Sequence, residues 1–480
     1  MTSPTSYSAT SASKDSSASS AQRESDTRAS IAARIAAKFG PANVIVDTAS
    51  LAAYEVDGMR PAAAVMAGSA EEIAELLRFA GAEKLAVIPC GGRTKLGIGA
   101  PPARYDVALD LSRMNRVLAY EPRDLTLGME PGVQLSSLWE TLVTEKQWLP
   151  IFAGFGGCAT VGGVVATDSA SPLRYAYGGL RDFVLGMEFV TGYGAAAKSG
   201  GRVVKNVSGY DSHKLLIGSL GTLAVITRLN FKTFPFPPAR DVFIAHFENA
   251  VGAMDFSRAV RKSALEPKLV EAISPEAAKI ISSGAESPLP LRMDGWSVAL
   301  GVAAHERVVE RHARELAILA AQANASDFVG LGGDDQSAFL TPLCEFPSLA
   351  LAAAPGAAIF RIAALPTAMA ALAERLAVLA VGAQLEHSTI LRPHGLVFFA
   401  LMPSRASEPD GARLVRAAKD VFRTAAELGA KARMEWAPME LKRAVSVWGE
   451  ARPDIALMRR VKEIFDPGNI LSPGRFAGGI

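Results

Sequence analysis

The chain has 480 residues, and 49% of them are hydrophobic. This length exceeds what one hydrophobic core usually organises, so we expect two or three domains. The 50 Lys and Arg residues nearly equal the 48 Asp and Glu residues in number, and no lysine-rich tract or basic helical stripe is present. This charge distribution disfavours a nucleic acid as the ligand.

Residues 1–28 are rich in Ser, Thr and Ala and lack the apolar core of a signal peptide. No run of about 18 uninterrupted apolar residues occurs in the chain. We therefore predict a disordered tail, a cytoplasmic protein and no membrane span. The three cysteines, Cys90, Cys158 and Cys344, lie far apart without a CxxC motif, which argues against a bound iron–sulfur cluster.

The first predicted helix follows this tail. Ile31 and Ile35 recur at helical spacing, and Gly40 is a stop signal. A short strand is predicted at 44–46. We therefore place the start of the first domain at residue 29.

A second helix and a second strand come next. Ser69 and Glu72 form a capping box at the start of this helix, and Gly81 marks its end. The apolar run at 85–88 predicts a strand. This strand leads directly into a glycine-rich loop at 89–97.

The loop at 89–97 has the chemistry of an anion site. Gly91 and Gly92 permit the close approach of a ligand, and no helix begins readily there, so backbone N–H groups stay free. Arg93 and Lys95 add positive charge, and the loop therefore suits a diphosphate. Taken alone, a glycine turn after a strand is more often structural.

Further strands are predicted at 107–111 and 126–129, followed by a helix around 135–142. A second glycine-rich segment, 154–163, contains five glycines in ten residues and suits a large, flat ligand. It satisfies the GxGxxA pattern of a Rossmann site, but 160–163 follows in place of a clear helix, and no later acid is placed to bind a ribose. These two differences argue against a Rossmann site.

A third glycine cluster occupies 200–221. The next run, 223–232, alternates apolar and polar residues, which predicts a half-buried strand. Three prolines within 235–238 then mark a domain boundary. The first domain is therefore predicted to span 29–238.

The chain beyond this boundary is alanine-rich and mixes helices, such as 306–321, with strands, such as 396–402. We predict an α+β second domain over 239–445. The last segment, 446–480, changes character again and is expected to return to the first domain.

The order of these segments resembles the FAD-binding domain of the vanillyl-alcohol oxidase and p-cresol methylhydroxylase superfamily, within the FAD-linked oxidases of D-2-hydroxy acids. The stretch GGRVVKNVSGYDSHKLLIGSLGTLAVIT and the ending KEIFDPGNILSPGRF resemble most closely the FAD-binding subunits of glycolate oxidases. The resemblance covers nearly everything after about residue 40. It implies an α+β fold, with a two-part FAD-binding domain and an α+β cap.

The resemblance also implies which residues hold the cofactor. The first glycine loop corresponds to the pyrophosphate loop of the family, and the second corresponds to a segment that contacts both flavin and diphosphate. The stretch 218–226 corresponds to a strand entry that meets the flavin ring, and 469–475 corresponds to a C-terminal element in which Ser472 replaces the usual Asn. The implied FAD-binding residues are Pro89, Cys90, Gly91, Gly92, Arg93, Thr94, Lys95, Thr160, Val161, Gly162, Gly163, Ser169, Ala170, Tyr177, Gly178, Val225, Ile226 and Ser472.

Some members of the family attach FAD covalently through a histidine near the first glycine loop. This chain has no histidine before His213. We therefore expect noncovalent FAD, unless Cys90 or Cys158 bonds to it.

Catalytic relatives carry an HxGDGNLH element and an EHGxGxxK element, whose histidines and acid bind a divalent metal. In this chain the first element places Leu391 and Phe398 at its histidine positions, and the second places Trp436 there. None of these side chains can ligate a metal, so we predict no metal site.

Arg392 and His394 are the polar pair that remains near these positions. They could serve as carboxylate anchor and base for a hydroxy acid, although a structural pair is the simpler interpretation. Further candidates that could equally bridge loops are Arg202, Lys205, Tyr210 and Glu435. Met434 and Trp436 are expected to pack in a core rather than to cage a substrate.

An FAD-binding chain without a metal site fits one subunit of a larger oxidase. The resemblance implies a catalytic flavin subunit and an iron–sulfur subunit as partners, with a small 2-hydroxy acid such as glycolate as substrate. Electrons would pass to the iron–sulfur clusters, and contact with the inner face of the membrane would be peripheral and through the partners. Two alternatives stay open: a self-sufficient FAD-dependent dehydrogenase of another substrate such as D-lactate, and a non-catalytic flavin-binding scaffold.

Overall fold

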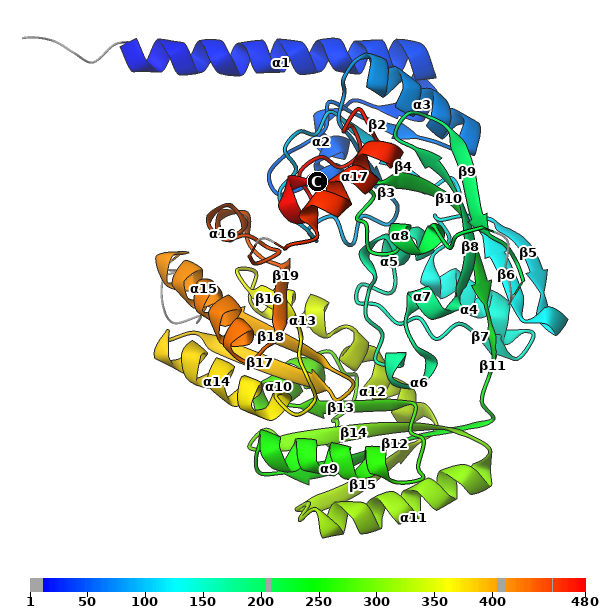
Figure 1. Ribbon diagram of the computed structural model, residues 1–480, viewed down its shortest axis with the longest axis vertical. Coiled ribbons are helices and arrows are strands. Elements are labelled where there is room, and N and C mark those ends of the chain that lie inside the picture. The colour runs from blue at the N-terminus through cyan, green and yellow to red at the C-terminus, as the bar shows by residue number, and fades with distance from the viewer. Residues whose placement is uncertain (1–11, 204–208, 404–410, 451) are drawn as a thin grey trace, which may run out of the picture.

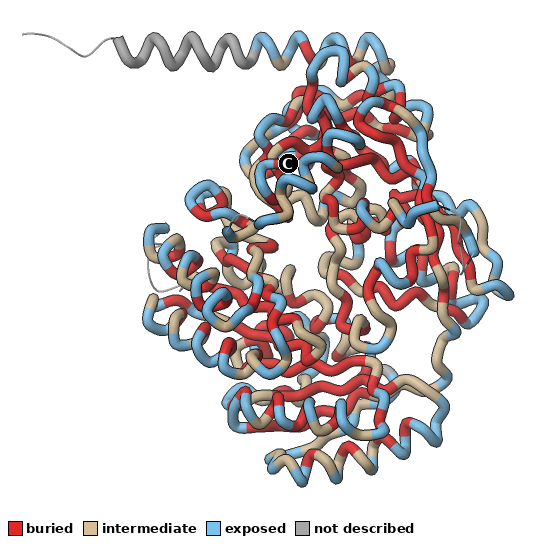
Figure 2. Tube along the Cα trace, in the orientation of Figure 1, coloured by how far each residue is buried: buried red, intermediate tan, exposed pale blue. Residues whose placement is uncertain are grey.

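The structure is a computed structural model that describes residues 12–203, 209–403, 411–450 and 452–480. In Figure 1 the first domain runs from blue to green, the cap runs from green to orange, and the red C-terminal segment lies back against the blue elements of the first domain. Figure 2 shows that the central strands are buried, whereas the outer faces of the helices are exposed.

The first domain opens with a small mixed sheet. Its strands are β1 (Val44–Ile45), β2 (Ala63–Met66), β3 (Val87–Cys90) and β4 (Val107–Asp110). The helices around it are α1 (Ala12–Phe39), η1 (Pro41–Asn43), α2 (Thr48–Leu51), η2 (Ala52–Tyr54) and α3 (Ala70–Ala82). The strand order is β1-β2-β4-β3, with β4 parallel to both of its neighbours. Because parallel strands end at the same edge, the loop after β3 lies at the carboxyl edge of this sheet.

Helix α1 begins earlier than the sequence led us to expect. We predicted a disordered tail over 1–28, but residues 12–28 are helical, and residues 1–11 lie outside the described residues. Alanine has the highest helix propensity, and this stretch extends a helix that is anchored by buried Ile31 and Ile35. The predicted stop is present, because Gly40 adopts a φ of +80°.

Helix α3 shows part of the predicted capping box. Ser69 Oγ accepts a hydrogen bond from the backbone N–H of Glu72 at 3.2 Å. The Glu72 carboxylate reaches back to the backbone N–H of Gly68, at 2.7 Å, rather than to that of Ser69. Two N–H groups at the helix start are therefore satisfied by side chains.

A second, antiparallel sheet completes the first domain. Its strands are β5 (Val117–Glu121), β6 (Thr126–Met129), β8 (Val184–Thr191), β9 (Ala196–Gly200) and β10 (Ala224–Lys232), in the order β5-β6-β10-β8-β9. A separate pair is formed by β7 (Gln147–Trp148) and β11 (Phe234–Pro235). The helical segments are η3 (Pro122–Asp124), α4 (Leu135–Val143), α5 (Val161–Thr167), α6 (Arg174–Tyr177), α7 (Leu180–Phe183) and α8 (His213–Leu216).

The cap is built on an eight-stranded antiparallel sheet. Its strands are β12 (Ala239–Phe247), β13 (Leu269–Ile273), β14 (Trp296–Ala304), β15 (Asp327–Gly332), β16 (Ala358–Ala363), β17 (Glu386–Arg392), β18 (Leu396–Met402) and β19 (Lys431–Trp436). Its helices are α9 (Ala250–Lys262), α10 (Pro275–Ser283), α11 (Glu306–Gln322), α12 (Asp334–Cys344), α13 (Phe346–Ala353), α14 (Met369–Gly382) and α15 (Gly411–Glu427). The boundary that we predict at 238 falls between β11 and β12.

The cap contains the same supersecondary unit twice. The strand order is β15-β12-β14-β13-β17-β18-β16-β19, so each half is a β-α-β-β-α-β unit of the ferredoxin-like type. The two units join where β13 pairs with β17, through Ala272 opposite Leu391 and Ile273 opposite Ile390. Helices α9, α11, α14 and α15 cover one face, whereas α10, α12, α13 and parts of the first domain cover the other.

The C-terminal segment adds to the edge of the first sheet. It contains α17 (Ile455–Phe465) and η4 (Ala477–Gly479), and it follows α16 (Met439–Ala444), which packs against α15 of the cap. The backbone N–H of Val87 donates to Ile470 O at 2.7 Å, and that of Ser472 donates to Val87 O at 2.9 Å. The segment therefore lies along β3, next to the first glycine loop. Among the described residues, no helix has both the length and the apolar character that crossing a bilayer requires.

Candidate functional site

The first glycine loop keeps backbone donors free. The N–H groups of Gly91, Arg93 and Thr94 form no hydrogen bond within the described part of the chain. A Cβ atom on Gly92 would lie 1.8 Å from the carbonyl oxygen of Cys158 in the second loop, so only glycine permits this approach. The loop therefore presents unused N–H groups, as an anion site requires.

The two cations of this loop differ in their surroundings. Arg93 forms an ion pair with buried Asp110 at 2.8 Å, and its guanidinium lies 4.8 Å from the ring centroid of Tyr54. Lys95 has no ion-pair partner within the described residues, and its Nζ donates to Gly154 O at 2.8 Å. Of the two cations, Lys95 is therefore the one that has no acid in contact.

The second glycine segment begins a helix, which corrects the prediction from the sequence. Helix α5 starts after Thr160, whose Oγ1 accepts from the N–H of Gly163 at 3.4 Å. The N–H of Val161 donates to Val133 O, and that of Gly162 donates to Pro131 O. Glycine lowers helix propensity, but the burial of apolar residues on this helix offsets that cost. This segment therefore offers a close-packed glycine surface rather than free N–H donors.

Both glycine segments line one cavity of about 820 Å³. The predicted cofactor residues on its wall are Pro89, Cys90, Gly91, Gly92, Arg93, Thr94, Lys95, Thr160, Gly162, Gly163, Val225 and Ile226. The cavity is also lined by Leu96 of the first glycine loop, by Ser219, Leu220, Gly221 and Ala224 of the predicted stretch 218–226, and by Arg475 of the predicted element 469–475. The lining residues that we did not predict are Ile88, Ile98, Leu111, Pro131, Ala166 and Thr167. The free N–H groups of the first loop and the glycine wall of the second segment together fit the diphosphate of FAD.

Six predicted cofactor residues lie away from this wall. Val161 is fully buried in the core beneath α5, because it lies on the inner side of that helix. Ser169 and Ala170 face a second cavity, since the chain turns at Asp168 with a φ of +47°. The other three, which also do not line the first cavity, are Tyr177, Gly178 and Ser472.

Local packing explains these last three positions. The Tyr177 ring packs edge-on against Trp148, with centroids 5.5 Å apart. Gly178 adopts a φ of +82° at the end of α6, where its N–H caps the helix. Ser472 is fully buried, and its Oγ forms no hydrogen bond within the described residues. The replacement of the usual Asn by Ser at this position therefore leaves a buried hydroxyl without a partner.

Arg475 brings the C-terminal segment to the cofactor cavity. Its guanidinium donates to the backbone carbonyls of Leu96 and Ile98, just after the first glycine loop. The backbone N–H of Ala100 donates to Arg475 O at 3.0 Å. Arg475 lies in the segment that we predicted to return, but the sequence offers no signal that it faces the cavity.

A second cavity lies between the first domain and the cap. It shares Lys95 and Ile98 with the cofactor cavity, so the two are neighbours. Burial of the ammonium group lowers the pKa of Lys95 to about 8, although the Glu345 and Glu435 carboxylates oppose that shift. Lys95 is therefore mostly charged at neutral pH and loses its charge in mildly alkaline solution.

Arg392, one of the two predicted catalytic residues, lines this second cavity. It forms a buried ion pair with Glu271 at 2.8 Å and donates to Ala170 O of the first domain at 3.0 Å. Burial raises the pKa of Glu271 to about 7, against the opposing effect of Arg392. The pair lies at the junction of the two cap units, because Glu271 is on β13 and Arg392 ends β17.

His394, the other predicted catalytic residue, does not accompany Arg392. It lines a larger, open cleft between the cap and the first domain. Burial and three nearby arginines lower the pKa of His394 to about 4, and both ring nitrogens lack hydrogen-bond partners within the described residues. The structure therefore separates the predicted pair, because the turn at 393–395 directs the two side chains to different cavities.

Two further residues of the cap line the second cavity. Glu435 Oε1 accepts from Arg433 at 2.7 Å and from Arg361 at 3.2 Å, whereas Oε2 forms no hydrogen bond within the described residues. These two arginines lower the pKa of Glu435 despite its burial. Trp436 also lines the cavity, contrary to our expectation of a core position, whereas Met434 is buried in the cap core as expected.

Two of the remaining candidates, Arg202 and Tyr210, line neither cavity. Tyr210 is 93% exposed and Arg202 is also exposed, and Lys205 lies outside the described residues. Within the described part of the chain, no group of three or more His, Cys, Asp or Glu residues is placed to hold a metal ion.

Comparison with known proteins agrees with this geometry. A family model for the FAD binding domain matches residues 61–213, and one for the C-terminal domain of FAD linked oxidases matches residues 440–476. The chain is 30% identical to D-2-hydroxyglutarate dehydrogenase of Xanthomonas citri pv. viticola, over 86% of this chain and 89% of that protein. It is 24% identical to glycolate oxidase subunit GlcD of Bacillus subtilis, over 91% of this chain and 94% of that protein.

The solved structure of p-cresol methylhydroxylase with substrate bound has a similar fold. The TM-score is 0.73 with 17% sequence identity, over 95% of this chain and 97% of that chain. The fold and the glycine-lined cavity thus define a flavoprotein of the p-cresol methylhydroxylase type. The chain belongs to the FAD-linked oxidase family and is an FAD-dependent oxidoreductase. The fold class and the cofactor predicted from the sequence are confirmed.

Proposed function

We propose that the chain oxidises a small 2-hydroxy acid in the cavity between the first domain and the cap. The observation that carries this proposal is the shared wall at Lys95 and Ile98, which sets that cavity beside the cofactor cavity. FAD, when bound, accepts a hydride from the carbon that bears the hydroxyl group. The chain must then supply a cation for the substrate carboxylate and an acceptor for the hydroxyl proton.

Lys95 and Glu435 have the chemistry for these two tasks. The Lys95 ammonium group has no acid in contact within the described residues and can anchor the substrate carboxylate. Glu435 is held ionised by Arg361 and Arg433, and its Oε2 is free to accept the hydroxyl proton. When the carbon loses its hydride and the oxygen loses its proton, the product is a 2-oxo acid.

We further propose that FAD is held noncovalently. Among the described residues, no histidine lines the cofactor cavity. Cys90 does line it, but burial raises the pKa of its thiol, which disfavours the nucleophilic thiolate. Acid precipitation should leave all of the flavin in the supernatant, and flavin retained in the pellet would contradict this proposal.

Anaerobic mixing of the purified holoprotein with hydroxy acids tests the proposed reaction. The flavin absorbance near ~450 nm should bleach in a single exponential, and one equivalent of 2-oxo acid should form for each flavin reduced. The control is the corresponding acid without the hydroxyl group, which should leave the flavin oxidised. An absence of bleaching with every 2-hydroxy acid would show that the proposal is wrong.

We propose that the chain works as the FAD-binding subunit of a glycolate oxidase-like complex, with a catalytic flavin subunit and an iron–sulfur subunit. One relative bears the name of a glycolate oxidase subunit, and the three cysteines of this chain are all free. The iron–sulfur clusters of such a complex would therefore belong to another chain. Isolation from native extract, with flavin and iron quantified, should recover both in one complex.

A self-sufficient dehydrogenase is the second candidate. It is favoured by the near full-length match to D-2-hydroxyglutarate dehydrogenase and by the cavity beside the cofactor site in this single chain. Steady turnover of the isolated chain with a dye as acceptor, together with the absence of iron in the native isolate, would favour this candidate over the complex.

A further inference from the structure

The second cavity is lined mainly by aromatic and aliphatic side chains. Phe155 from the first domain and Trp436 from the cap form a tilted pair, with ring centroids 5.4 Å apart. Phe398, Leu343 and Ile390 belong to the same lining. A ligand that fills this cavity must therefore bring an apolar surface of its own.

The positions of the aromatic residues are fixed by their neighbours. A Cβ atom on Gly97 would lie 2.9 Å from the Trp436 ring, so the absence of a side chain there makes room for the indole. Glu345 holds the loop that carries Phe155, by accepting from the N–H groups of Phe155 and Gly156 at 2.6 and 2.7 Å. The apolar wall is therefore preformed, and a fitting ligand loses little free energy in ordering it.

The charges of the same cavity suit a single carboxylate. Its cationic side chains, among the described residues, are Lys95 and Arg392. Arg392 is engaged by Glu271 in a buried ion pair and by the carbonyl oxygen of Ala170, which leaves Lys95 as the cation without an acid in contact. Glu435 is already paired with Arg361 and Arg433, so this side of the cavity offers no free cation to a second carboxylate.

We propose that this cavity selects monocarboxylic 2-hydroxy acids with a bulky apolar side chain, either aromatic or branched aliphatic. The inference rests on the proposed function, because it assigns the substrate class of the same site. Glycolate has no side chain and leaves the aromatic wall without a partner. A dicarboxylate such as 2-hydroxyglutarate places its second charge against apolar side chains and Glu435, where no free cation meets it.

The substrate series that tests this proposal is glycolate, 2-hydroxyisocaproate, 3-phenyllactate and 2-hydroxyglutarate, each as both enantiomers where these exist. Rates of anaerobic flavin reduction by the holoprotein give the specificity constant for each. Burial of a large apolar side chain predicts a constant for 3-phenyllactate that exceeds the one for glycolate by about thirtyfold or more. The proposal is overturned if glycolate or 2-hydroxyglutarate reduces the flavin as efficiently as 3-phenyllactate does.

A pair of matched variants locates the selectivity. Trp436→Leu should reduce the ratio of the constants for 3-phenyllactate and glycolate by about tenfold. Trp139→Leu removes a partly exposed indole outside the lining of both cavities and should leave the ratio unchanged. If Trp436→Leu does not fold, Phe155→Leu changes the other half of the aromatic pair. An unchanged ratio in a folded cavity variant contradicts the proposal.

Binding without turnover separates this inference from the proposed reaction. Calorimetric titration of the holoprotein with 3-phenylpropanoate, which has no hydroxyl group, should give a dissociation constant at least about thirtyfold lower than acetate or glutarate. If 3-phenylpropanoate binds in this way but no 2-hydroxy acid bleaches the flavin, the proposed reaction fails and the ligand class stands. If a 2-hydroxy acid bleaches the flavin and 3-phenylpropanoate binds no tighter than acetate, the ligand class fails.

Discussion

At the scale of single residues, Lys95 is a cation without an acid in contact among the described residues. Its ammonium group is largely buried, contacts a carbonyl oxygen rather than an acid, and lies on the wall that the two cavities share. Burial without a paired acid makes the charged form less stable, and this lowers the pKa to about 8. A substrate carboxylate in contact would restore the missing partner.

The pH dependence of substrate binding should follow this lysine. Lys95 is a cation below its pKa, so binding of the carboxylate is strongest below pH 8 and weakens as the pH rises through that value. The KM for a 2-hydroxy acid, measured with a dye acceptor between about pH 6 and pH 10, should therefore rise in alkaline solution.

Lys95→Gln should raise the KM about tenfold to a hundredfold at pH 7 and remove this alkaline rise. Lys95→Arg, which keeps the charge at every pH, should restore binding and show no rise. A persistent alkaline rise in Lys95→Gln would mean that another group titrates.

Gly92 should be essential for cofactor binding because of one close contact. The methyl group in Gly92→Ala would overlap the carbonyl oxygen of Cys158 and push the two glycine segments apart. We expect the dissociation constant for FAD, followed by the recovery of flavin fluorescence, to rise by about a hundredfold or more, with a loss of about 1–3 kcal/mol in the free energy of unfolding. Gly157→Ala in the opposing segment is the control, because its Cβ meets no atom within 4 Å. Equal flavin affinity in the two variants would contradict this account.

At the scale of secondary-structure elements, the C-terminal segment is fastened by one buried lysine. Lys462 on α17 donates to Asp466 at 2.7 Å, to Thr222 O at 2.7 Å and to Leu471 O at 2.8 Å. Asp466 in turn accepts from the N–H of Leu471 at 2.8 Å. Burial lowers the pKa of Lys462, although Asp466 opposes the shift. This network joins α17, the tail and the entry to β10 into one unit.

Removal of this ammonium group should loosen the whole C-terminal segment. Lys462→Met leaves the Asp466 carboxylate buried without its cation and should lower the free energy of unfolding by about 3–5 kcal/mol. The comparison is Lys38→Met, because Lys38 pairs with Glu75 at the surface and its loss should cost less than about 1 kcal/mol. Urea denaturation, followed by circular dichroism, measures both changes. Similar values for the two variants would contradict a fastening role for Lys462.

The sequence predicts elements well where turn signals bound a strand. Strands β6 and β18 match the predicted ranges 126–129 and 396–402 residue for residue, because alternation or a short apolar run ends at a clear turn. Helix α5 was missed because two glycines signal a loop, while the packing that stabilises the helix comes from residues distant in sequence. The two similar units of the cap were also missed, because strand order is a property of tertiary pairing.

The candidate site shows the same limit. Residues 89–95, Thr160, Gly162 and Gly163 line the cofactor cavity, and their glycines are a signal that the sequence itself contains, because small size is a local property. Ser169 and Ala170 line the second cavity rather than the first, because the turn at Asp168 decides which way they face. Trp436 and Lys95 become neighbours of one cavity only when the cap folds against the first domain, which no local pattern reveals.

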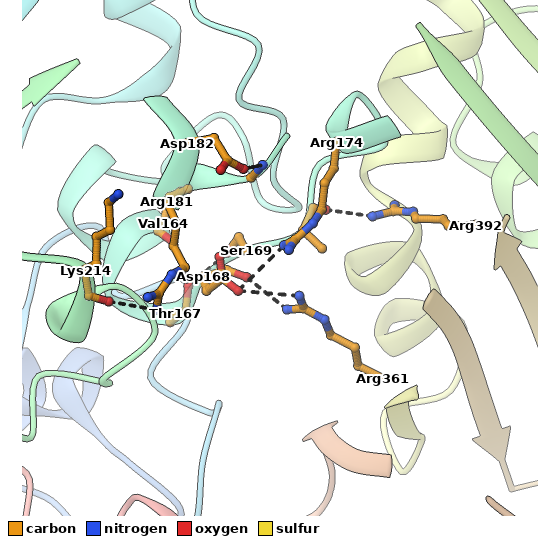
Figure 3. A network of polar contacts seen from close by, with 12 residues as sticks. Val164, Thr167, Asp168, Ser169, Arg174, Arg181, Asp182, Lys214, Arg361 and Arg392 are labelled. Carbon is orange, nitrogen blue, oxygen red and sulfur yellow. Dashed lines mark hydrogen bonds and ion pairs between the residues drawn. The ribbon is translucent and has the colours of Figure 1, made fainter. Parts of the chain in front are cut away.

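At the scale of the whole molecule, one polar network connects the cap to the first domain. Figure 3 shows Arg361 of the cap pointing at Asp168, where Arg174 also converges, while Arg392 reaches across to the first domain. Arg361 donates to Asp168 O at 2.9 Å and to Glu435 Oε1 at 3.2 Å. Asp168 immediately follows α5, which forms part of the cofactor wall. This network therefore connects that wall to Glu435, which lines the second cavity.

Loss of Arg361 should therefore uncouple the two parts of the molecule. Arg361→Met removes the contacts to Asp168 and Glu435 while keeping an apolar side chain of similar length. We expect flavin reduction by substrate to slow by about tenfold to a hundredfold, because Glu435 keeps only Arg433 of the two arginines that hold it beside the cavity. Thermal unfolding followed by calorimetry should change from one transition to two, as the cap and the first domain lose their coupling. Arg375→Met is the control, because Arg375 pairs with Glu427 at the surface of the cap and, among the described residues, makes no hydrogen bond or ion pair with the first domain. A single transition and an unchanged reduction rate in Arg361→Met would show that the apolar contacts between cap and first domain suffice to align the two cavities.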